Sequence, residues 1–404
     1  MKQLIIIGSG ISGLACSYYL RKKFKIKIFE QNDYLGGHTH THLLENEKIH
    51  YDSGFIVFND KNYSNFIKLI NALHVKYQIS NMSFSVTNDK INYEWAGKNL
   101  RTIFDIKNIF TIRYFKILRD IIRFSKLCEN STLIHDYSLK KFLYKNNFSK
   151  EFINLYLLPM CSSIWSSDLK DIKNYNTSFI ISFFKNHGLN NIITKRPTWY
   201  TIKNGSKSYI KKIIKIVKPK IYLNEKVIKV DQKKKFIKTI KNKKYNYDHL
   251  IFANHTNQIK QILNRPERKQ LKLLNVVKYQ KNNITVHSDQ NLMPKNFKNW
   301  SSWNYLYSNK KLVLTYWMNL LQKLSCKKKI FVTLNYDKIK QKNIIKKISY
   351  EHPLFTNPLL KVDKISDAAQ GINNIWFSGA WLGYGFHEDG VKSALKVRKL
   401  INAK

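Results

Sequence analysis

The chain has 404 residues and a formal net charge of +45 at pH 7. Its length suits one large domain or two, and no apolar run reaches the roughly 18 residues that cross a bilayer. So high a charge fits an anionic membrane surface, nucleic acid or acidic substrates. The basic runs are scattered and no nucleic-acid-binding module is present, so we expect no nucleic-acid partner. Compositional drift in an AT-rich genome is a further interpretation of the same charge.

The cysteines also limit the class of protein. The four of them lie far apart and form no C-x-x-C pair, so they indicate neither a zinc site nor a disulfide framework. A reducing compartment fits this usage. The first apolar run, residues 4–7, is too short for a signal peptide. We therefore predict a cytoplasmic protein, with peripheral contact with the inner face of the membrane as the alternative.

The first predicted element is a buried strand over residues 4–7. The motif G-x-G-x-x-G follows it and then a helical pattern, which is the context that a dinucleotide-binding turn requires. Gly8 permits the tight turn, Gly10 lets a pyrophosphate approach the backbone, and Gly13 lets the helix pack on the strand. The free amides at the start of the helix, at Ile11 and Ser12, favour phosphate binding.

A second strand is predicted over residues 25–30 and ends at Glu30. An acid about 20 residues past the glycines is placed to accept hydrogen bonds from ribose hydroxyls. A carboxylate there repels a 2′-phosphate, so NADP is disfavoured. The fingerprint alone leaves NAD and FAD open.

The stretch GGHTHTH, residues 36–42, follows that acid closely. It resembles the flavin signature of the amine-oxidase-like flavoproteins. The resemblance implies that Gly36 and Gly37 pass under the FAD pyrophosphate. It also implies that His38 contacts the cofactor where many members carry Arg, as a weaker and pH-dependent partner. A metal site is the alternative for these histidines, but nothing nearby supplies further ligands, and ordinary packing is a third interpretation. We predict no metal.

Later passages resemble the same family. They are D-S-G at 52–54, the strands at 226–230 and 247–255, and the closing stretch from residue 375. The helix predicted to start at Asp389–Gly390 would aim its positive end at the flavin N1–C2=O, an effect of about 0.3–2 kcal/mol. Ala380 stands where most relatives place an acid for the ribitol. The cofactor contacts that the resemblance implies are Gly54, Val227, Ala253, Gly379, Ala380, Asp389 and Gly390.

The ordered run of these motifs covers nearly the whole chain. It resembles a bacterial NAD/FAD-binding flavoprotein subgroup related to the N-terminal segment of plant cyclopropane fatty-acid synthases. The implied fold class is α/β, a Rossmann-like FAD-binding domain of the amine oxidase/glutathione-reductase type with an interleaved α+β substrate domain. We expect residues 1–84, 200–258 and 365–404 to form the FAD-binding domain, and 85–199 and 259–364 the substrate or cap domain. The implied cofactor is non-covalent FAD.

The middle of the chain is predicted to build an apolar pocket. Residues 107–129 form an amphipathic basic helix, either a cap over the site or a helix on a membrane surface. A helix near 157–167 and aromatic strands in 298–321 complete the walls or are plain core. Weak catalytic candidates are His387, Glu388, Tyr305 and Tyr316.

These observations favour an FAD-dependent dehydrogenase or desaturase that takes a hydride from an apolar, lipid or fatty-acyl, substrate. A flavin amine oxidase is one alternative, and a non-catalytic flavin-binding membrane-surface protein is another. No second G-x-G-x-x-G is present, so the electron acceptor stays unnamed.

Overall fold

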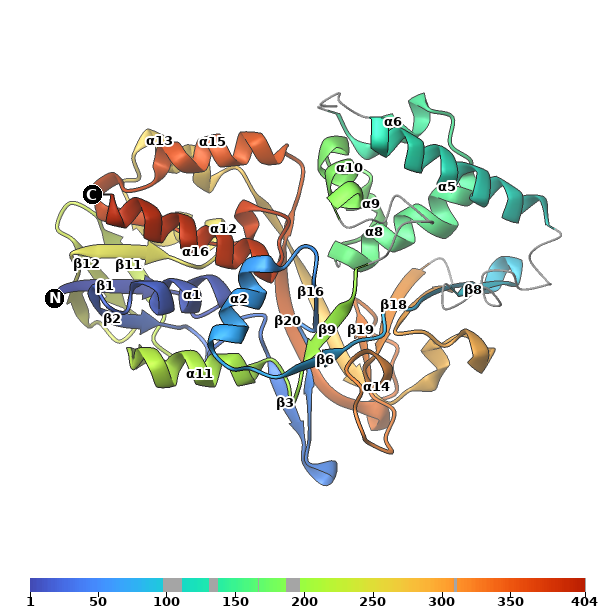
Figure 1. Ribbon diagram of the computed structural model, residues 1–404, viewed down its shortest axis with the longest axis horizontal. Helices are drawn as coiled ribbons and strands as arrows, with labels where there is room; N and C mark the ends of the chain where they lie inside the picture. The colour runs from blue at the N-terminus through green and yellow to red at the C-terminus, as the bar shows by residue number, and fades with distance from the viewer. Residues whose placement is uncertain (97–110, 131–136, 166, 187–196, 309–310, 404) are drawn as a thin grey trace.

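A computed structural model describes residues 1–96, 111–130, 137–165, 167–186, 197–308 and 311–403. Its first layer is a parallel five-stranded sheet in the order β10-β2-β1-β14-β21 (Figure 1). The strands are β1 (Lys2–Ile7), β2 (Phe24–Phe29), β10 (Lys220–Tyr222), β14 (His249–Phe252) and β21 (Ile375–Phe377). The Leu and Ile side chains of β1 are buried because both faces of the sheet are covered.

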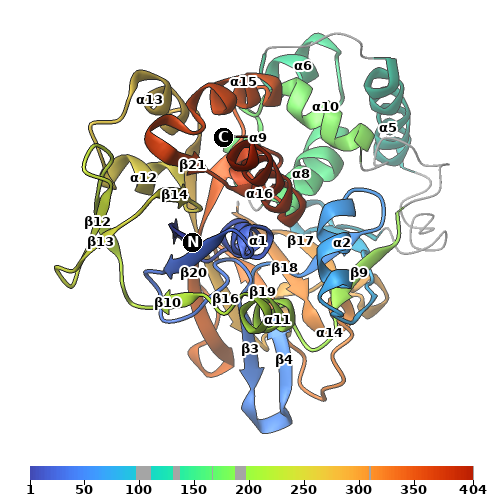
Figure 2. The same ribbon diagram turned by 60° about the vertical axis from the view of Figure 1, so that its left-hand side comes forward.

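One face of this sheet is covered by helices α1 (Ile11–Leu20), α2 (Ser64–Ala72), α11 (Lys207–Val217) and α16 (His387–Asn402). Helix α1 lies beside α16, as Figure 2 shows. The strands predicted near 4–7 and 25–30 are confirmed, and Glu30 directly follows β2. The last helix begins at His387, slightly before the predicted start, so Asp389 and Gly390 lie in its first turn.

The other face of the parallel sheet packs against a four-stranded sheet and three helices. The strands are β11 (Val227–Asp231), β12 (Phe236–Thr239), β13 (Lys244–Asn246) and β15 (Leu263–Asn264), and the helices are α12 (Thr256–Ile262), α13 (Arg268–Leu274) and α15 (Leu359–Ala369). Small sheets pair β3 (Thr41–Leu44) with β4 (Ile49–Asp52), and β5 (Val57–Asn59) and β6 (Tyr77–Ile79) with β9 (Trp199–Ile202).

A second large layer is the seven-stranded sheet β20-β16-β19-β18-β17-β7-β8. Its pairs are antiparallel except for β17 with β7. The strands are β7 (Phe84–Asn88), β8 (Tyr93–Ala96), β16 (Lys278–His287), β17 (Trp303–Ser308), β18 (Lys311–Trp317), β19 (Phe331–Leu334) and β20 (Ile344–Leu354), with α14 (Met318–Leu321) after β18. The aromatic strands predicted within 298–321 are therefore confirmed.

A helical group lies across this second sheet, at the upper right of Figure 1. It contains α5 (Ile112–Asn130), α6 (Leu139–Lys145), α7 (Lys150–Phe152), α8 (Leu158–Trp165), α9 (Leu169–Ile172) and α10 (Thr177–Asn186). Aromatic side chains form much of its core, among them Phe124, Phe142 and Phe179. Helix α5 confirms the predicted helix from residue 112 onward, and residues 107–110 lie outside the described part. In the described residues, no helix combines the length and apolarity needed to span a bilayer.

The predicted domain division stays a prediction. The five parallel strands all fall in its FAD-binding segments, and most strands of the second sheet fall in its substrate segments. However, Leu263, Leu273 and Val276 pack in the core against the parallel sheet. This packing favours a boundary near residue 278, where β16 begins, in place of residue 259.

Candidate functional site

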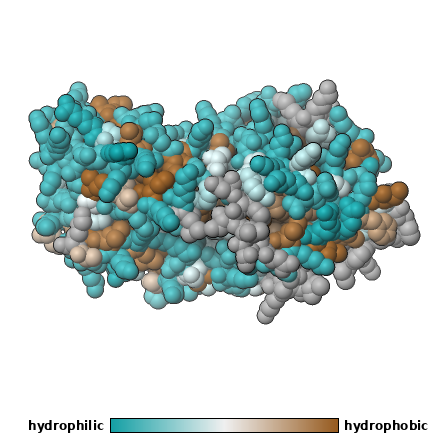
Figure 3. All heavy atoms as spheres, turned by 90° about the horizontal axis from the view of Figure 1, so that it is seen from above, coloured by the Kyte–Doolittle hydropathy of each residue, from teal (hydrophilic) through white to brown (hydrophobic). Residues whose placement is uncertain are grey.

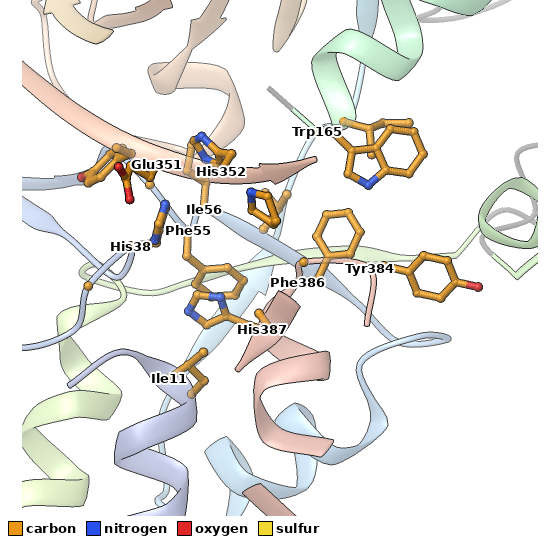
Figure 4. A pocket seen from close by; sticks show the side chains of 18 of the residues that line it. Ile11, His38, Phe55, Ile56, Trp165, Glu351, His352, Tyr384, Phe386 and His387 are labelled. Atoms are coloured by element: carbon orange, nitrogen blue, oxygen red, sulfur yellow. The ribbon is translucent and has the colours of Figure 1, made fainter. Parts of the chain in front are cut away.

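A cavity of about 1350 Å³ opens at the carboxyl ends of the parallel strands. The residues that follow β1, β2 and β14 line it, namely Gly8, Glu30 and Ala253, and Gly379 lines it just beyond β21. In open parallel sheets the crevice at this edge is the usual place for ligands. Figure 4 shows part of the wall, where side chains from both large layers face the same space.

The glycine turn after β1 has the geometry that its motif predicts. Gly8 has a φ of +101°, and a Cβ there would come within 2.8 Å of the Ala253 carbonyl oxygen. A Cβ on Gly13 would collide with the carbonyl oxygen of Gly8. By contrast, a Cβ on Gly10 would meet no atom within 4 Å in the described structure, although Gly10 lines the cavity. The glycines at 8 and 13 therefore serve packing, whereas the one at 10 leaves space open. Ile11 and Ser12, in the first turn of α1, also line the cavity.

Glu30 is held against this turn. Its carboxylate accepts hydrogen bonds from the Ser9 amide at 3.0 Å, the Ser9 hydroxyl at 2.6 Å and the Asn32 amide at 3.0 Å. The side chain is buried yet lines the cavity. The acid is therefore fixed where ribose hydroxyls would meet it. The sequence did not single out Ser9, which orients Glu30.

The glycine pair at 36–37 lies directly against the first turn. The Gly36 amide donates to the Ser9 carbonyl at 3.1 Å, and Gly36 forms a parallel bridge with Gly10. Gly36 and Gly37 have φ values of +121° and +58°, which glycine adopts without strain. Both glycines line the cavity, and the expected passage of this segment beside a dinucleotide stays a prediction.

His38 faces a group of rings in the cavity wall. Its ring centroid lies 5.0 Å from that of His352, and Figure 4 shows both rings. The centroids of Tyr350 and His255 lie 4.9 Å and 6.2 Å from it. Burial, and then repulsion from the neighbouring histidines, hold the pKa of His38 well below its ordinary value. Its Nε2 atom is buried and has no partner among the described residues. His255 and His352 carried no local sequence signal, because they come from distant elements.

The other two histidines of GGHTHTH are packed and hydrogen-bonded. His40 stacks on Tyr34, with centroids 3.9 Å apart, and His42 Nε2 pairs with the Ser53 hydroxyl at 2.8 Å. In the part of the chain that the structure describes, no group of three or more His, Cys, Asp or Glu side chains is arranged to hold a metal ion.

The segment around Gly54 closes over the glycine pair. The Phe55 amide donates to the His38 carbonyl at 2.7 Å, and a Cβ on Gly54 would collide with that same oxygen. The ring of Phe55 stacks on His387 at 3.5 Å between centroids. Gly54 lines the cavity, and its contact with the cofactor stays a prediction.

The first turn of α16 meets the first turn of α1. A Cβ on Gly390 would come within 2.7 Å of Ile11 and 2.9 Å of the Ser12 hydroxyl, so glycine permits this approach. The Asp389 carboxylate accepts from the Phe386 amide at 3.0 Å, and burial raises its pKa to about 7. Asp389 and Gly390 do not line the cavity; they position the helix whose first residue, His387, does.

His387 is the one polar candidate of the last helix that lines the cavity. Its Nε2 atom lies 2.8 Å from the Thr39 hydroxyl and 3.2 Å from the Tyr209 hydroxyl. Burial lowers the pKa of His387 to about 3. The imidazole is therefore neutral at physiological pH and does not act as a cationic acid.

The other three catalytic candidates have different places. The Glu388 carboxylate accepts from the backbone amides of Asn65 and Phe66 at 3.2 and 2.8 Å, at the start of α2, and does not line the cavity. This use as a cap disfavours a catalytic role. Tyr305 is buried and does not line the cavity either. Tyr316 lines it and donates to the Ser163 carbonyl at 3.3 Å.

Val227 and Ala380 line the cavity as well, together with Ala253 and Gly379. The Ala253 amide donates a hydrogen bond to the Ile7 carbonyl at 2.8 Å, and the Gly379 amide donates one to the Ser393 hydroxyl at 3.0 Å. The structure thus brings most of the predicted cofactor residues to one cavity. Three predicted residues support it without lining it: Gly13, Asp389 and Gly390.

Beyond the carboxyl edge, the cavity continues between the second sheet and the helical group. No charged side chain occurs among its described lining residues in the ranges 79–199 and 284–334. Aromatic and aliphatic side chains from α5, α8, β17 and β18 dominate this part. They include Ile117, Leu118, Ile121, Met160, Trp165, Trp303 and Tyr316. The indole N–H of Trp165 has no partner among the described residues, and Figure 4 shows the ring at the cavity wall.

Comparisons with known proteins agree with this geometry. Residues 6–73 match the model of the NAD(P)-binding Rossmann-like domain. The 1-hydroxycarotenoid 3,4-desaturase of Flavobacterium sp. (strain P99-3) is 29% identical over 222 residues, covering 52% of this chain and 41% of that protein. The chain thus matches less than half the length of this curated relative.

Solved structures match over the whole chain. The CLA-producing fatty acid isomerase from P. acnes has a TM-score of 0.68 and 12% identity, covering 100% of this chain and 98% of its own. The cyclohexylamine oxidase from Brevibacterium oxydans IH-35A has a TM-score of 0.69 and 13% identity, with 99% of both chains covered. The chain therefore has the α/β fold of the amine-oxidase-like oxidoreductases, built on a Rossmann-like dinucleotide-binding domain.

Proposed function

We propose that the protein holds FAD non-covalently and is an oxidoreductase that removes a hydride from an apolar, lipid or fatty-acyl substrate. One observation carries this proposal: a single cavity joins the dinucleotide-binding edge of the parallel sheet to an uncharged chamber lined by aromatic and aliphatic side chains. Such a chamber suits a long apolar molecule.

The residues at the sheet edge fit FAD. Gly10 leaves open space at the start of α1, where backbone amides favour a diphosphate. Glu30 is fixed for the ribose, and Gly36 and Gly37 present bare backbone beside the turn. The unpartnered Nε2 of His38 offers one more hydrogen-bonding atom. Val227, Gly54, Ala253, Gly379 and Ala380 would complete the walls around the cofactor.

The relatives support the apolar substrate class. The name of the curated relative describes a carotenoid desaturase, and one structural neighbour is named a fatty acid isomerase. The bound flavin would supply the hydride acceptor at its N5 atom. A dehydrogenation then removes a hydride and a proton from adjacent carbons, with the proton passing to water and the electron pair leaving to an acceptor of the oxygen or quinone class.

The protein's own residues would orient the substrate and exclude water. Phe55 and His387 form a stacked pair beside the cavity, and His387 stays neutral because its pKa is about 3. Tyr316 and Trp165 wall the chamber. These residues would position a C–H bond of the substrate and would not act as an acid or a base.

An amine oxidase is the second candidate, because a cyclohexylamine oxidase shares the fold. Cationic substrates favour acidic groups. The chamber has no charged lining residue in the described ranges 79–199 and 284–334, which argues for the apolar substrate. A cytoplasmic location remains part of the proposal and is supported by the wide spacing of the four cysteines along the sequence, which indicates no disulfide framework.

An anaerobic reduction screen tests the proposal. Purified protein loaded with FAD is mixed with detergent-dispersed unsaturated fatty acids or polyenes, and in parallel with alkylamines and polyamines. We expect the flavin absorbance to bleach with the apolar set alone. Bleaching by amines alone would favour the oxidase. A loaded protein that no substrate reduces would favour a flavin-binding protein without turnover, and a protein that binds no FAD would refute the proposal.

A further inference from the structure

Helix α5 has two apolar faces. Its inner face is buried on the helical group and the second sheet through Tyr114, Ile117 and Phe124. On its outer face, Ile112 is 77% exposed, Phe115 60% and Ile122 50%. A helix that only caps a site needs a single apolar face. The packing of the described residues therefore does not account for the outer apolar face of α5.

The outer apolar side chains share their stripe with basic ones. Residues 112, 115, 119, 122 and 126 follow a 3-4-3-4 spacing, which places them on one side of the helix. All five are exposed, and the two that are not apolar are Arg119 and Lys126. Helix α5 carries five basic residues against Asp120 and Glu129. The buried Asp120 pairs with Arg119 at 3.0 Å and with Arg123 at 2.9 Å, and the side chain of Arg119 remains 58% exposed.

The exposed apolar residues elsewhere are more scattered. Those on other elements include Ile216, Ile228, Ile240 and Leu271, and the described chain shows no second helix with three of them in one stripe. Figure 3, viewed from above, shows hydrophobic side chains among hydrophilic ones toward the right-hand end of the molecule, where α5 lies in Figure 1.

We propose that the outer face of α5 docks on an anionic lipid surface. Apolar side chains that enter the headgroup boundary and basic side chains that meet anionic headgroups are the two requirements of an interfacial helix. A second copy of the chain is a poor occupant, because the same basic stripe on a protein of charge +45 would face itself.

The helix also connects this surface to the cavity. Tyr114, Ile117, Leu118 and Ile121 of α5 line the cavity from the inner side. One helix therefore touches both the proposed lipid surface and the apolar chamber. The idea that substrate enters the chamber from the lipid surface rests on the proposed function. The docking on the lipid surface does not rest on it.

Vesicle cosedimentation of the whole protein tests the docking. The probe is phosphatidylcholine vesicles with and without phosphatidylglycerol, at about 0.15 M and about 0.5 M salt, where diffuse charge attraction is screened. The variant Ile112→Ser/Phe115→Ser/Ile122→Ser removes the apolar stripe and keeps the charge. The matched control Ile216→Ser/Ile228→Ser/Ile240→Ser removes three other exposed isoleucines, 44%, 41% and 59% exposed.

We expect the α5 variant to bind anionic vesicles at least tenfold more weakly than the wild type at both salt concentrations, and the control to bind like the wild type. The single variant Phe115→Ser is tested as well, in case the triple variant does not fold. Thermal unfolding of each variant, followed by circular dichroism, shows whether it is folded. Equal binding by all proteins, or complete loss of wild-type binding at high salt, would show diffuse charge attraction and overturn the proposal. A wild-type dimer that the α5 variant dissociates would assign the face to a protein interface instead. Vesicle binding without flavin bleaching would refute the proposed function alone.

Discussion

Substitution of Gly10 by Ala separates cofactor binding from folding. Gly10 has φ −64° and ψ 179°, which alanine adopts without strain, and its Cβ would meet no described atom within 4 Å. Loss of a glycine stiffens the unfolded chain and stabilises the fold by about 0.4–1 kcal/mol. Alanine is a poorer helix N-cap than glycine by a similar amount. We therefore expect the free energy of unfolding of the flavin-free protein to change by less than about 0.5 kcal/mol.

Cofactor affinity should respond very differently. The new methyl group would occupy the open space beside the start of α1 and keep the diphosphate from the backbone amides there. We expect the Kd for FAD to rise at least about tenfold, which is about 1.4 kcal/mol. Flavin fluorescence titration measures the affinity, and urea unfolding of the flavin-free protein measures the stability.

Gly13→Ala is the matched comparison. Its Cβ would collide with the Gly8 carbonyl oxygen, so the backbone must shift and the flavin-free protein should lose about 1–3 kcal/mol of stability. If Gly10→Ala binds FAD as tightly as the wild type, the glycine turn does not hold the diphosphate. If it destabilises the flavin-free protein as much as Gly13→Ala, the space at Gly10 is not open.

Three further outcomes are expected. Glu30→Gln should raise the Kd for FAD about tenfold in the same titration, because charged hydrogen bonds to the ribose would become neutral ones. An unchanged Kd would show that Glu30 does not bind the ribose. Glu388→Gln should lower the free energy of unfolding in urea by about 1–3 kcal/mol, because the carboxylate caps α2. Turnover per bound flavin should stay unchanged. A loss of turnover at full flavin loading would show that Glu388 is catalytic. Stability should rise between about pH 4 and 6.5 by at least ~1.4 kcal/mol per pH unit. The reason is that six buried or partly buried histidines with lowered pKa values do not take up protons that the unfolded chain binds, whereas three aspartates with raised pKa values have the opposite effect. A melting temperature that does not change with pH would contradict this. The groups are His38, His40, His42, His287, His352 and His387, against Asp52, Asp171 and Asp389.

The glycine-based part of the site could be predicted from the sequence because its signals are local. The G-x-G-x-x-G turn, the acid that follows β2 and the pair at 36–37 each need a residue type that a short stretch reveals. A positive φ at Gly8, Gly36 and Gly37 is a property of the local backbone. The structure places all of these residues except Gly13 at one cavity, although their contacts with a cofactor stay predictions.

The roles of polar residues could not be predicted in the same way, because their partners lie far along the chain. Glu388 looked catalytic beside His387, yet it accepts hydrogen bonds from two backbone amides in the first turn of α2, 323 and 322 residues earlier in the chain. His255 and His352 meet His38 only because β14 and β20 approach the same edge. The helix start at His387 also preceded the expected one, because the Asp389 carboxylate caps the Phe386 amide.

The strong positive charge of the chain does not extend to the residues that line its cavity. Despite the net charge of +45, the described residues that line the cavity include three glutamates, Glu30, Glu225 and Glu351, and a single lysine, Lys226. Side-chain charge therefore gives this cavity little attraction for the proposed diphosphate, which would depend on the backbone amides at the start of α1. Gly390 lets the starts of α1 and α16 meet. Because basic residues lie outside the cavity, on surfaces such as the outer face of α5, the proposed cofactor binding and the proposed membrane docking would depend on different residues, and separate substitutions should disrupt each of them.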